Sequence, residues 1–433
     1  MNFRMTPRPF RNVVGVLLLA AVVLSGCATP VGVRYLDSKE THRKLTETVL
    51  SADQLSAPTL QILNRAALTR IVPTDPAAAI AALHAGLPTA QASDRLFALA
   101  ELSFLHAAQG GRRPYYLAAA AYAYAFLFPP PDEIPPDPFD PRLRTAVDLY
   151  NQGIANGFAG AEAGRVELQA GTYPLPFGEL VVRAGPDEFR WGPFRLVDFV
   201  HAAALDVRGL HNDYRWPGIG APLVAALKHV PGERVREFLR VPSSLKVAAT
   251  ALLQFDNVRE GLHSGRMTAT LLLFTTQEGA AVAIGGRMVP LEFRPSAALA
   301  YTLEGSQVYA LELKGLLSGD FALLKQSARF KDNVFLMAPY IPGRIPLVLV
   351  HGTASSPARW AQLLNEILND RDLWHRYQVW LFTYNTGNPI LFSGGILARG
   401  LRHVVAELDP EGTDAALRKM VVIGHSQGGC SPS

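Results

Sequence analysis

Cysteine is almost missing from this 433-residue sequence, which contains only Cys27 and Cys430 and therefore has no framework of internal disulfides. Charged residues are also scarce, at 18% of the chain against 49% apolar residues, which indicates a folded rather than a disordered protein. The formal net charge of +4 includes three arginines of the first 26 residues. Because Lys and Arg form no cluster elsewhere, we expect no binding to nucleic acid.

Metal-ligand spacing is missing as well. His201, His211, His229 and His263 are scattered through the middle of the chain, which is typical of surface or core histidines. We therefore expect neither a metal nor an organic cofactor. After the first 26 residues there is also no apolar run long enough to cross a bilayer.

The amino terminus has the pattern of an export signal. Three arginines precede an apolar run over residues 13–24, which is too short to span a bilayer comfortably. The sequence L-S-G-C that ends at Cys27 resembles the bacterial lipobox, which implies cleavage after residue 26 and lipidation of Cys27. The alternative is an ordinary secretory signal with a chance cysteine. Because Ala28 stands where Asp would be an inner-membrane retention signal, we expect a lipid-anchored envelope protein on the outer membrane, facing the periplasm.

The composition divides the mature chain into four regions. Residues 27–128 are rich in Ala and Leu and predict a mainly helical region, which could bind a protein partner. Its tyrosines favour core packing over a groove. Residues 129–141 form a proline-rich linker, and residues 142–334 predict a mixed α/β and β-rich region, including strands near residues 268–277, 279–284, 287–293 and 306–313. Residues 335–433 form the last region.

This last region alternates strands and helices. Apolar runs at residues 345–350, 377–384 and 420–426 predict three strands, and amphipathic segments between them predict two helices. Such alternation is typical of a parallel α/β sheet, in which ligands bind beyond the carboxyl ends of the strands. Two loops fall at those ends: His351-Gly352-Thr353, and the segment from Gly424 to Gly428.

The second loop reads G-H-S-Q-G and is a candidate nucleophile elbow. Ser426 would stand on a tight turn from strand to helix, and Gly424 and Gly428 would let the two elements approach closely. The backbone N–H groups of Gln427 and Thr353 would face a developing oxyanion. The motif alone is weak, and the alternative is an accidental glycine-rich turn, but the preceding strand and the earlier His-Gly turn favour the elbow.

From about residue 336 to residue 429 the chain resembles the first half of a lipase/esterase-type α/β-hydrolase. The resemblance is carried by the segment from His351 to Trp360, by the strand over residues 377–384, and by the motif from Gly424 to Gly429. It implies a partial α/β-hydrolase sheet at the C-terminus, with Ser426 as nucleophile and with Gly352 turning the loop that carries Thr353. It also implies an acyl-ester or lipid substrate and an acyl-serine intermediate.

Neither triad partner follows the candidate nucleophile. In this fold an acid and then a histidine follow the serine, but the seven residues after Ser426 include no Asp, Glu or His. His375, His403 and Asp409 lie in or near helical segments, so we do not expect them to replace the triad. Two hypotheses remain: a truncated ester hydrolase, inactive as written, and a non-catalytic envelope lipoprotein that acts as a binding or scaffold module.

Overall fold

The computed structural model describes residues 31–87, 92–110, 112–185, 189–230, 240–304, 333–352, 355, 357–384 and 387–430. Residues 1–26, Cys27 and the strand expected at residues 306–313 lie outside these ranges. The chain divides into two compact units, Met1–Thr46 and Glu47–Ser433. The described part of the first unit is an extended segment followed by helix α2 (Ser38–Thr46), which buries none of its residues.

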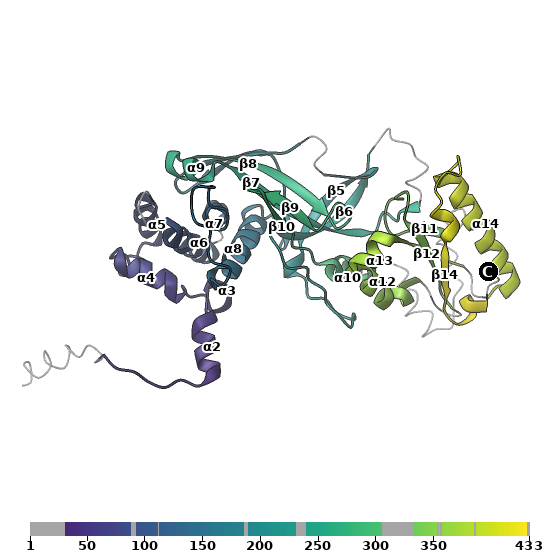
Figure 1. Cartoon of the computed structure of the whole chain (residues 1–433), viewed down its shortest axis with the longest axis horizontal. Helices are drawn as coiled ribbons and strands as arrows, with labels where there is room; N and C mark the ends of the chain where they lie inside the picture. The colour runs from purple at the N-terminus through teal and green to yellow at the C-terminus, as the bar shows by residue number, and fades with distance from the viewer. Residues whose placement is uncertain are drawn as a thin grey trace, which may run out of the picture. The chain divides into compact units, whose positions relative to one another are not determined.

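A layer of helices opens the second unit and appears in purple and blue in Figure 1. Its core is alanine-rich, because small side chains let α6, α7 and α8 approach closely. A Cβ added to Gly153 of α8 would lie 2.8 Å from the carbonyl oxygen of Tyr116 in α7. The layer consists of α3 (Val49–Ala52), α4 (Ala57–Arg65), α5 (Pro76–Ala85), α6 (Ala92–Ala108), α7 (Arg113–Leu127) and α8 (Arg142–Gly157).

The tyrosines of this layer pack in the core. Tyr122 and Tyr150 are fully buried, and the hydroxyl of Tyr150 donates to the carbonyl of Leu253 at 2.6 Å. The expectation of core packing is confirmed for Tyr122 and Tyr124 of α7, whereas Tyr115 and Tyr116 are half-buried. Glu101 is equally buried in α6, and its carboxylate accepts hydrogen bonds from Val49 N, Ser56 N, Ser56 Oγ and Thr59 Oγ1.

The middle of the chain folds into an eight-stranded sheet, ordered β1-β5-β6-β7-β8-β3-β2 with β4 paired to β5. All pairings are antiparallel except β3 with β8. The expected strand near residues 268–277 is β8, whereas several earlier strands had not been predicted individually. The bounds are β1 (Arg165–Val166), β2 (Gly171–Leu175), β3 (Gly178–Arg183), β4 (Arg190–Trp191), β5 (Phe194–His201), β6 (Ala221–His229), β7 (Lys246–Asp256) and β8 (Arg266–Thr275).

Shorter elements surround this sheet. A one-turn helix η1 (Ala202–Ala204) follows β5, α9 (Val258–Ser264) joins β7 to β8, and β9 (Ala281–Ile284) pairs with β10 (Arg287–Pro290). Gly285 and Gly286 form the hairpin turn between β9 and β10, and both glycines have positive φ. Helix α10 (Pro295–Glu304) follows.

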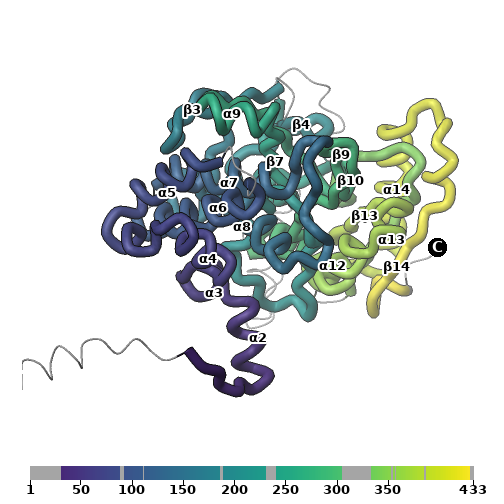
Figure 2. The backbone as a smooth tube through the Cα atoms, turned by 60° about the vertical axis from the view of Figure 1, so that its left-hand side comes forward, coloured from purple at the N-terminus to yellow at the C-terminus, as the bar shows by residue number. Residues whose placement is uncertain are grey.

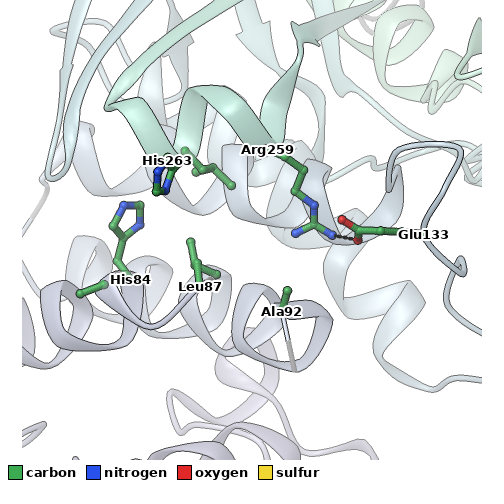
Figure 3. Close-up of a pocket in the computed structure, with 8 residues that line it drawn as sticks. His84, Leu87, Ala92, Glu133, Arg259 and His263 are labelled. Carbon is green, nitrogen blue, oxygen red and sulfur yellow. Dashed lines mark hydrogen bonds and ion pairs between the residues drawn. The ribbon is translucent and has the colours of Figure 1, made fainter. Parts of the chain in front are cut away.

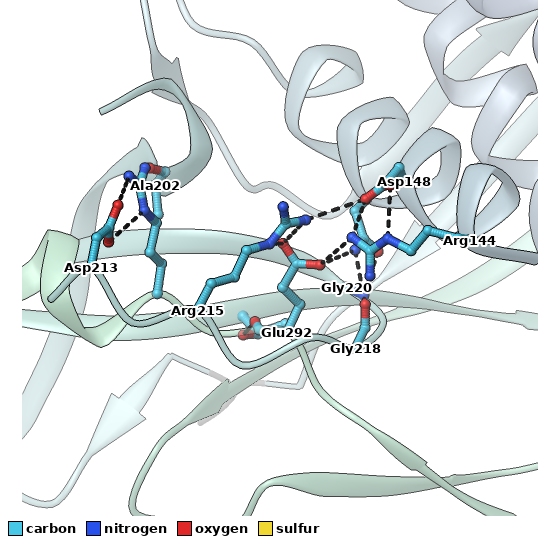
Figure 4. A network of polar contacts seen from close by, with 11 residues as sticks. Arg144, Asp148, Ala202, Asp213, Arg215, Gly218, Gly220 and Glu292 are labelled. Atoms are coloured by element: carbon cyan, nitrogen blue, oxygen red, sulfur yellow. Dashed lines mark hydrogen bonds and ion pairs between the residues drawn. The ribbon is translucent and has the colours of Figure 1, made fainter. Parts of the chain in front are cut away.

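A buried carboxylate connects the helical layer to the sheet (Figure 4). Glu292 is 1% exposed and accepts hydrogen bonds from Asn151 of α8 at 2.9 Å and from Arg215 at 2.8 Å. Arg215 also reaches Asp148 at 3.2 Å. Burial raises the pKa of Glu292, whereas Arg215 and Arg144 lower it. The charge is paired on several sides, as a buried carboxylate requires.

The carboxyl-terminal part forms a four-stranded mixed sheet, ordered β11-β13-β12-β14. Strand β12 pairs in parallel with both β13 and β14, and β11 pairs antiparallel with β13. Helices cover the sheet because their apolar residues, including Leu364 and Ile367, pack against β12 and β13. The elements are β11 (Val334–Leu336), β12 (Ile345–Val350), η4 (Pro357–Trp360), α12 (Ala361–Asn369), α13 (Arg371–Arg376), β13 (Tyr377–Phe382), α14 (Ile390–Leu408), η5 (Leu417–Lys419), β14 (Val421–Gly424) and η6 (Ser426–Cys430).

The chain as a whole thus combines helices with mixed sheets, as the sequence predicts in general terms. The three strands expected in the last region are β12, β13 and β14, and β11 is an addition. Figure 2 shows β14 and α14 in yellow and yellow-green at the rim of the second unit. Within the described residues, no helix is long and apolar enough to cross a membrane.

Candidate functional site

Ser426 occupies the first position after the parallel strand β14 and its connecting residue His425. Its φ is +56°, a left-handed conformation that a residue with a Cβ adopts only where its surroundings enforce it. The turn is held on both sides: His425 N donates to Val350 O at 3.0 Å, and Gly428 N donates to His425 O at 3.0 Å. The Ser426 side chain is exposed. The fold therefore presents this hydroxyl at the carboxyl end of the strand.

Three glycines make the turn sterically feasible. A Cβ on Gly424 would overlap the carbonyl of Gly428, and a Cβ on Gly428 would lie 2.6 Å from Val350 O. A Cβ on Gly352 would lie 2.8 Å from the Cβ of Ser426. Such separations are shorter than real Cβ contacts, so each position excludes other residues. The structure thus brings together Gly352, Gly424, Gly428 and Ser426, which the sequence had placed in two separate loops.

His351 supports the first of these loops and does not act on Ser426. The ring is 2% exposed, stacks on Tyr384 with 4.7 Å between ring centroids, and places Nδ1 3.1 Å from the carbonyl oxygen of Gly352. Burial lowers the pKa of His351 to about 4, against the opposing effect of the Gly352 hydrogen bond. The Tyr384 hydroxyl donates to His351 O at 2.7 Å. A neutral, fully packed imidazole therefore fixes the His351-Gly352 turn.

The expected oxyanion donors are placed only in part. Gln427 is half-buried in η6, directly after Ser426. Thr353, the other expected donor, lies outside the described residues, as does Cys27, the expected lipidation site. Trp360 presents its ring edge-on to His425, with 6.3 Å between centroids and an interplanar angle of 86°. The sequence places Trp360 and Tyr384 in the segments that carry the resemblance, but it assigns neither a role in the site, because both act through contacts over long sequence separations.

The upstream acids and bases lie in other contacts. His375 lies in the last turn of α13, just before β13 and at the amino end of the parallel strands, whereas Ser426 lies at the carboxyl end. Asp409 accepts hydrogen bonds from Thr413 N and Asp414 N in the turn that precedes β14. His403 faces Arg240, which is paired with Glu407. These positions agree with the expectation that none of the three replaces the triad.

A cavity lies elsewhere in the described part of the chain, between α5 and α9 (Figure 3). It has a volume of about 540 Å³ and is lined by His84, His263, Glu133 and Arg259, the last two forming an ion pair. His84 stacks on Phe177 and its Nδ1 lies 2.8 Å from the Tyr122 hydroxyl. Burial lowers the pKa of His84, as expected for a packed, neutral imidazole. The described residues that line this cavity include no Ser, Thr or Cys.

Among the described residues, no three His, Cys, Asp or Glu side chains gather where they could hold a metal ion. The geometry can therefore be summarised as an exposed serine hydroxyl on a strained turn, beside a second loop that a buried histidine fixes. Comparisons with known proteins give no further identification: no family model matches, and neither the curated proteins nor the solved structures contain a significant match.

Proposed function

We propose that this chain is an envelope lipoprotein of the serine ester hydrolase type and that Ser426 is its nucleophile. The observation that carries the proposal is the left-handed φ of Ser426 between two glycines that no other residue could replace. Strain of this kind is expensive and is concentrated at functional sites. A second support is the strand order β13-β12-β14, which puts the Ser426 turn beside the His351-Gly352 turn.

The proposed reaction is acyl transfer to Ser426. The serine Oγ attacks the ester carbonyl while its proton passes to a base, and the alcohol leaves with a proton as the acyl-serine forms. Water then attacks the acyl-serine and releases the carboxylic acid. During both steps the negative oxygen would accept hydrogen bonds from backbone N–H groups, for which Gln427 and Thr353 are the candidates.

The base and its acid have to come from outside the described contacts of Ser426, since His375, His403 and Asp409 are held elsewhere. Serine is a poor nucleophile without a base. We therefore propose that ester hydrolysis requires a histidine base and an acid in addition to Ser426.

The experiment uses the full-length protein. A fluorophosphonate probe should label it at Ser426, and p-nitrophenyl ester hydrolysis should fall by several orders of magnitude in Ser426→Ala. The matched control is Ser264→Ala, which removes an exposed hydroxyl on α9. If the protein is not labelled at Ser426, the non-catalytic binding or scaffold function replaces this proposal.

The membrane anchor is a separate part of the proposal and has its own test. We propose that Cys27 carries the lipid and that the mature protein faces the periplasm from the outer membrane. Radiolabelled palmitate fed to expressing cells should enter the protein and should be absent from Cys27→Ala. Equal incorporation into both proteins would contradict the lipidation of Cys27.

A further inference from the structure

A surface loop of the middle region lies along the outer face of α12. This loop, residues 209–216, is called the brace below. Its contacts with α12 are polar: Gln362 donates to Gly209 O at 2.9 Å and accepts from His211 N at 3.0 Å. Glu366 accepts from Asn212 at 3.0 Å and from the Tyr214 hydroxyl at 2.5 Å. Two successive turns of the helix are thus held by side chains on one face.

The contact continues inward to buried groups. Asn365 is fully buried, donates to Asn212 O at 2.8 Å and accepts from Ser296 Oγ at 2.7 Å. The indole N–H of Trp216 donates to Asn369 at 3.1 Å. Fully satisfied buried polar groups specify one arrangement, because each would lose its partner in any other. The brace and α12 therefore fit together in one register.

The brace is itself fixed to the eight-stranded region. Arg294 joins Asp213 of the brace at 2.5 Å and also donates to the carbonyl oxygens of Ala202 and Leu205 (Figure 4). The guanidinium group is largely buried, at 15% side-chain exposure. Since Arg presents several donors in a rigid plane, one side chain can hold the base of the loop at three acceptors.

The amino end of α12 lies next to the nucleophile turn. The helix begins one residue after Trp360, whose ring contacts His425 beside Ser426. The inner face of α12 packs on β12, the strand that ends at the His351-Gly352 turn. A shift of α12 would therefore move Trp360 and disturb the packing of β12 at the same time.

We propose that the brace positions the nucleophile site through α12, so that Gln362, Glu366 and Tyr214 are positioning residues for Ser426. The proposal rests on the proposed function for its catalytic consequence. It assigns a role to the middle region in a site to which that region contributes no reacting group. Removing the outer contacts should let α12 shift, and a displacement near 1 Å can slow a reaction by about a hundredfold.

The first readout is the position of the tryptophan ¹⁹F signals, which can be measured whether or not the protein is catalytically active. The protein is labelled with 5-fluorotryptophan, and the signals of Trp360 and Trp216 among its five tryptophans are assigned by substitution. The double variant Gln362→Ala/Glu366→Ala should move both ¹⁹F signals. Asp372→Ala removes an exposed carboxylate on the neighbouring helix α13 and should move neither signal. Glu366→Gln should leave the Trp360 signal close to its position in the unsubstituted protein, because an amide still accepts a hydrogen bond.

The second readout is the rate of fluorophosphonate labelling at Ser426, which should fall up to about a hundredfold in the double variant. A Trp360 signal that stays in place while the Trp216 signal moves would overturn the proposal, as would a moved Trp360 signal with an unchanged labelling rate. Absence of labelling in the unsubstituted protein would instead reject the proposed function, and the Trp360 signal would still decide whether the brace reaches the turn.

Discussion

The helical layer and the carboxyl-terminal sheet of the second unit differ in how completely they bury their apolar residues. In the helical layer, Tyr122, Tyr150 and the alanines of α7 are completely buried between neighbouring helices. In the carboxyl-terminal sheet, Val421, Val422 and Ile423 of the edge strand β14 are 39%, 47% and 37% exposed. The strand that carries the strained serine turn is thus the least covered apolar strand of its sheet. Close packing at the turn and open faces along the strand therefore coexist within five residues.

This difference shows that the turn and the strand depend on different contacts. Ser426 is held by its own glycines, by Val350 and by the His351-Gly352 turn, so its conformation needs only β12 as a partner. The faces of β14 need a covering layer that the described residues do not provide. An exposed apolar edge strand is also a site of unwanted pairing. Three predictions test this separation.

The largest effect is expected from a side chain added in the closely packed helical layer. Gly153→Val should lower the free energy of unfolding by about 3 kcal/mol, because its Cβ would meet the backbone of α7. Gly424→Val should instead raise hydrogen exchange mainly in residues 421–428, with a smaller change in global unfolding. Gly395→Ala is the control, since that Cβ meets no other atom within 4 Å. Equal global losses in the two valine variants would show that the regions are not separable.

A pH dependence is expected from the buried His351 of the carboxyl-terminal sheet and from the half-buried His201 of the eight-stranded region. Burial lowers the pKa of His351 and that of His201 to about 4, and Arg215 and Arg294 add to the shift of His201. Between pH 6.5 and 4 the unfolded chain binds more protons at these groups, so stability must fall as the pH falls. The loss is about 1.4 kcal/mol per pH unit for each histidine across that window.

Urea unfolding at pH 7, 6 and 5 measures this dependence. His351→Asn should flatten the slope for the carboxyl-terminal sheet, and His201→Asn should flatten it for the eight-stranded region. His375→Asn, an exposed histidine at the end of α13, serves as the control and should leave the slope unchanged. If neither His351→Asn nor His201→Asn alters the pH dependence of stability, the assignment of neutral imidazoles is contradicted.

The smallest effect on stability is expected from a substitution in the exposed edge strand β14. Val422→Lys places a charge on an exposed position, so the free energy of unfolding should change by no more than about 0.5 kcal/mol. Self-association at high concentration should decrease, because charged residues block pairing between edges. Sedimentation velocity measures the association. A strongly destabilised variant would mean that β14 is covered in solution.

The sequence predicts some elements much better than others. Strand β12 has the predicted bounds because six apolar residues rich in β-branched side chains occur between clear breakers. Strand β11 was missed because three residues carry no periodicity, and several strands of the large sheet were missed because β7, for example, is apolar on both faces. The motif predicted the glycines and Ser426, since each has a local steric reason.

The rest of the site depends on contacts that local patterns do not contain. Tyr384 reaches His351 across 33 residues, and the brace reaches α12 across about 150 residues of sequence. Tyr214 stands in no recognisable motif, and the strand that ends at Tyr384 does not by itself predict the contact with His351. Such contacts follow from the strand order and from the path of the loop, so they become visible only once the chain is folded.

Mass spectrometry of the fluorophosphonate-treated protein decides whether the serine on the strained turn is a nucleophile. The probe mass is expected on the peptide that contains Ser426, in the unsubstituted protein and in Ser264→Ala, and on no peptide of Ser426→Ala. An unmodified Ser426 peptide, or an adduct that persists in Ser426→Ala, would show that the left-handed serine is a structural turn and that the chain acts by another means.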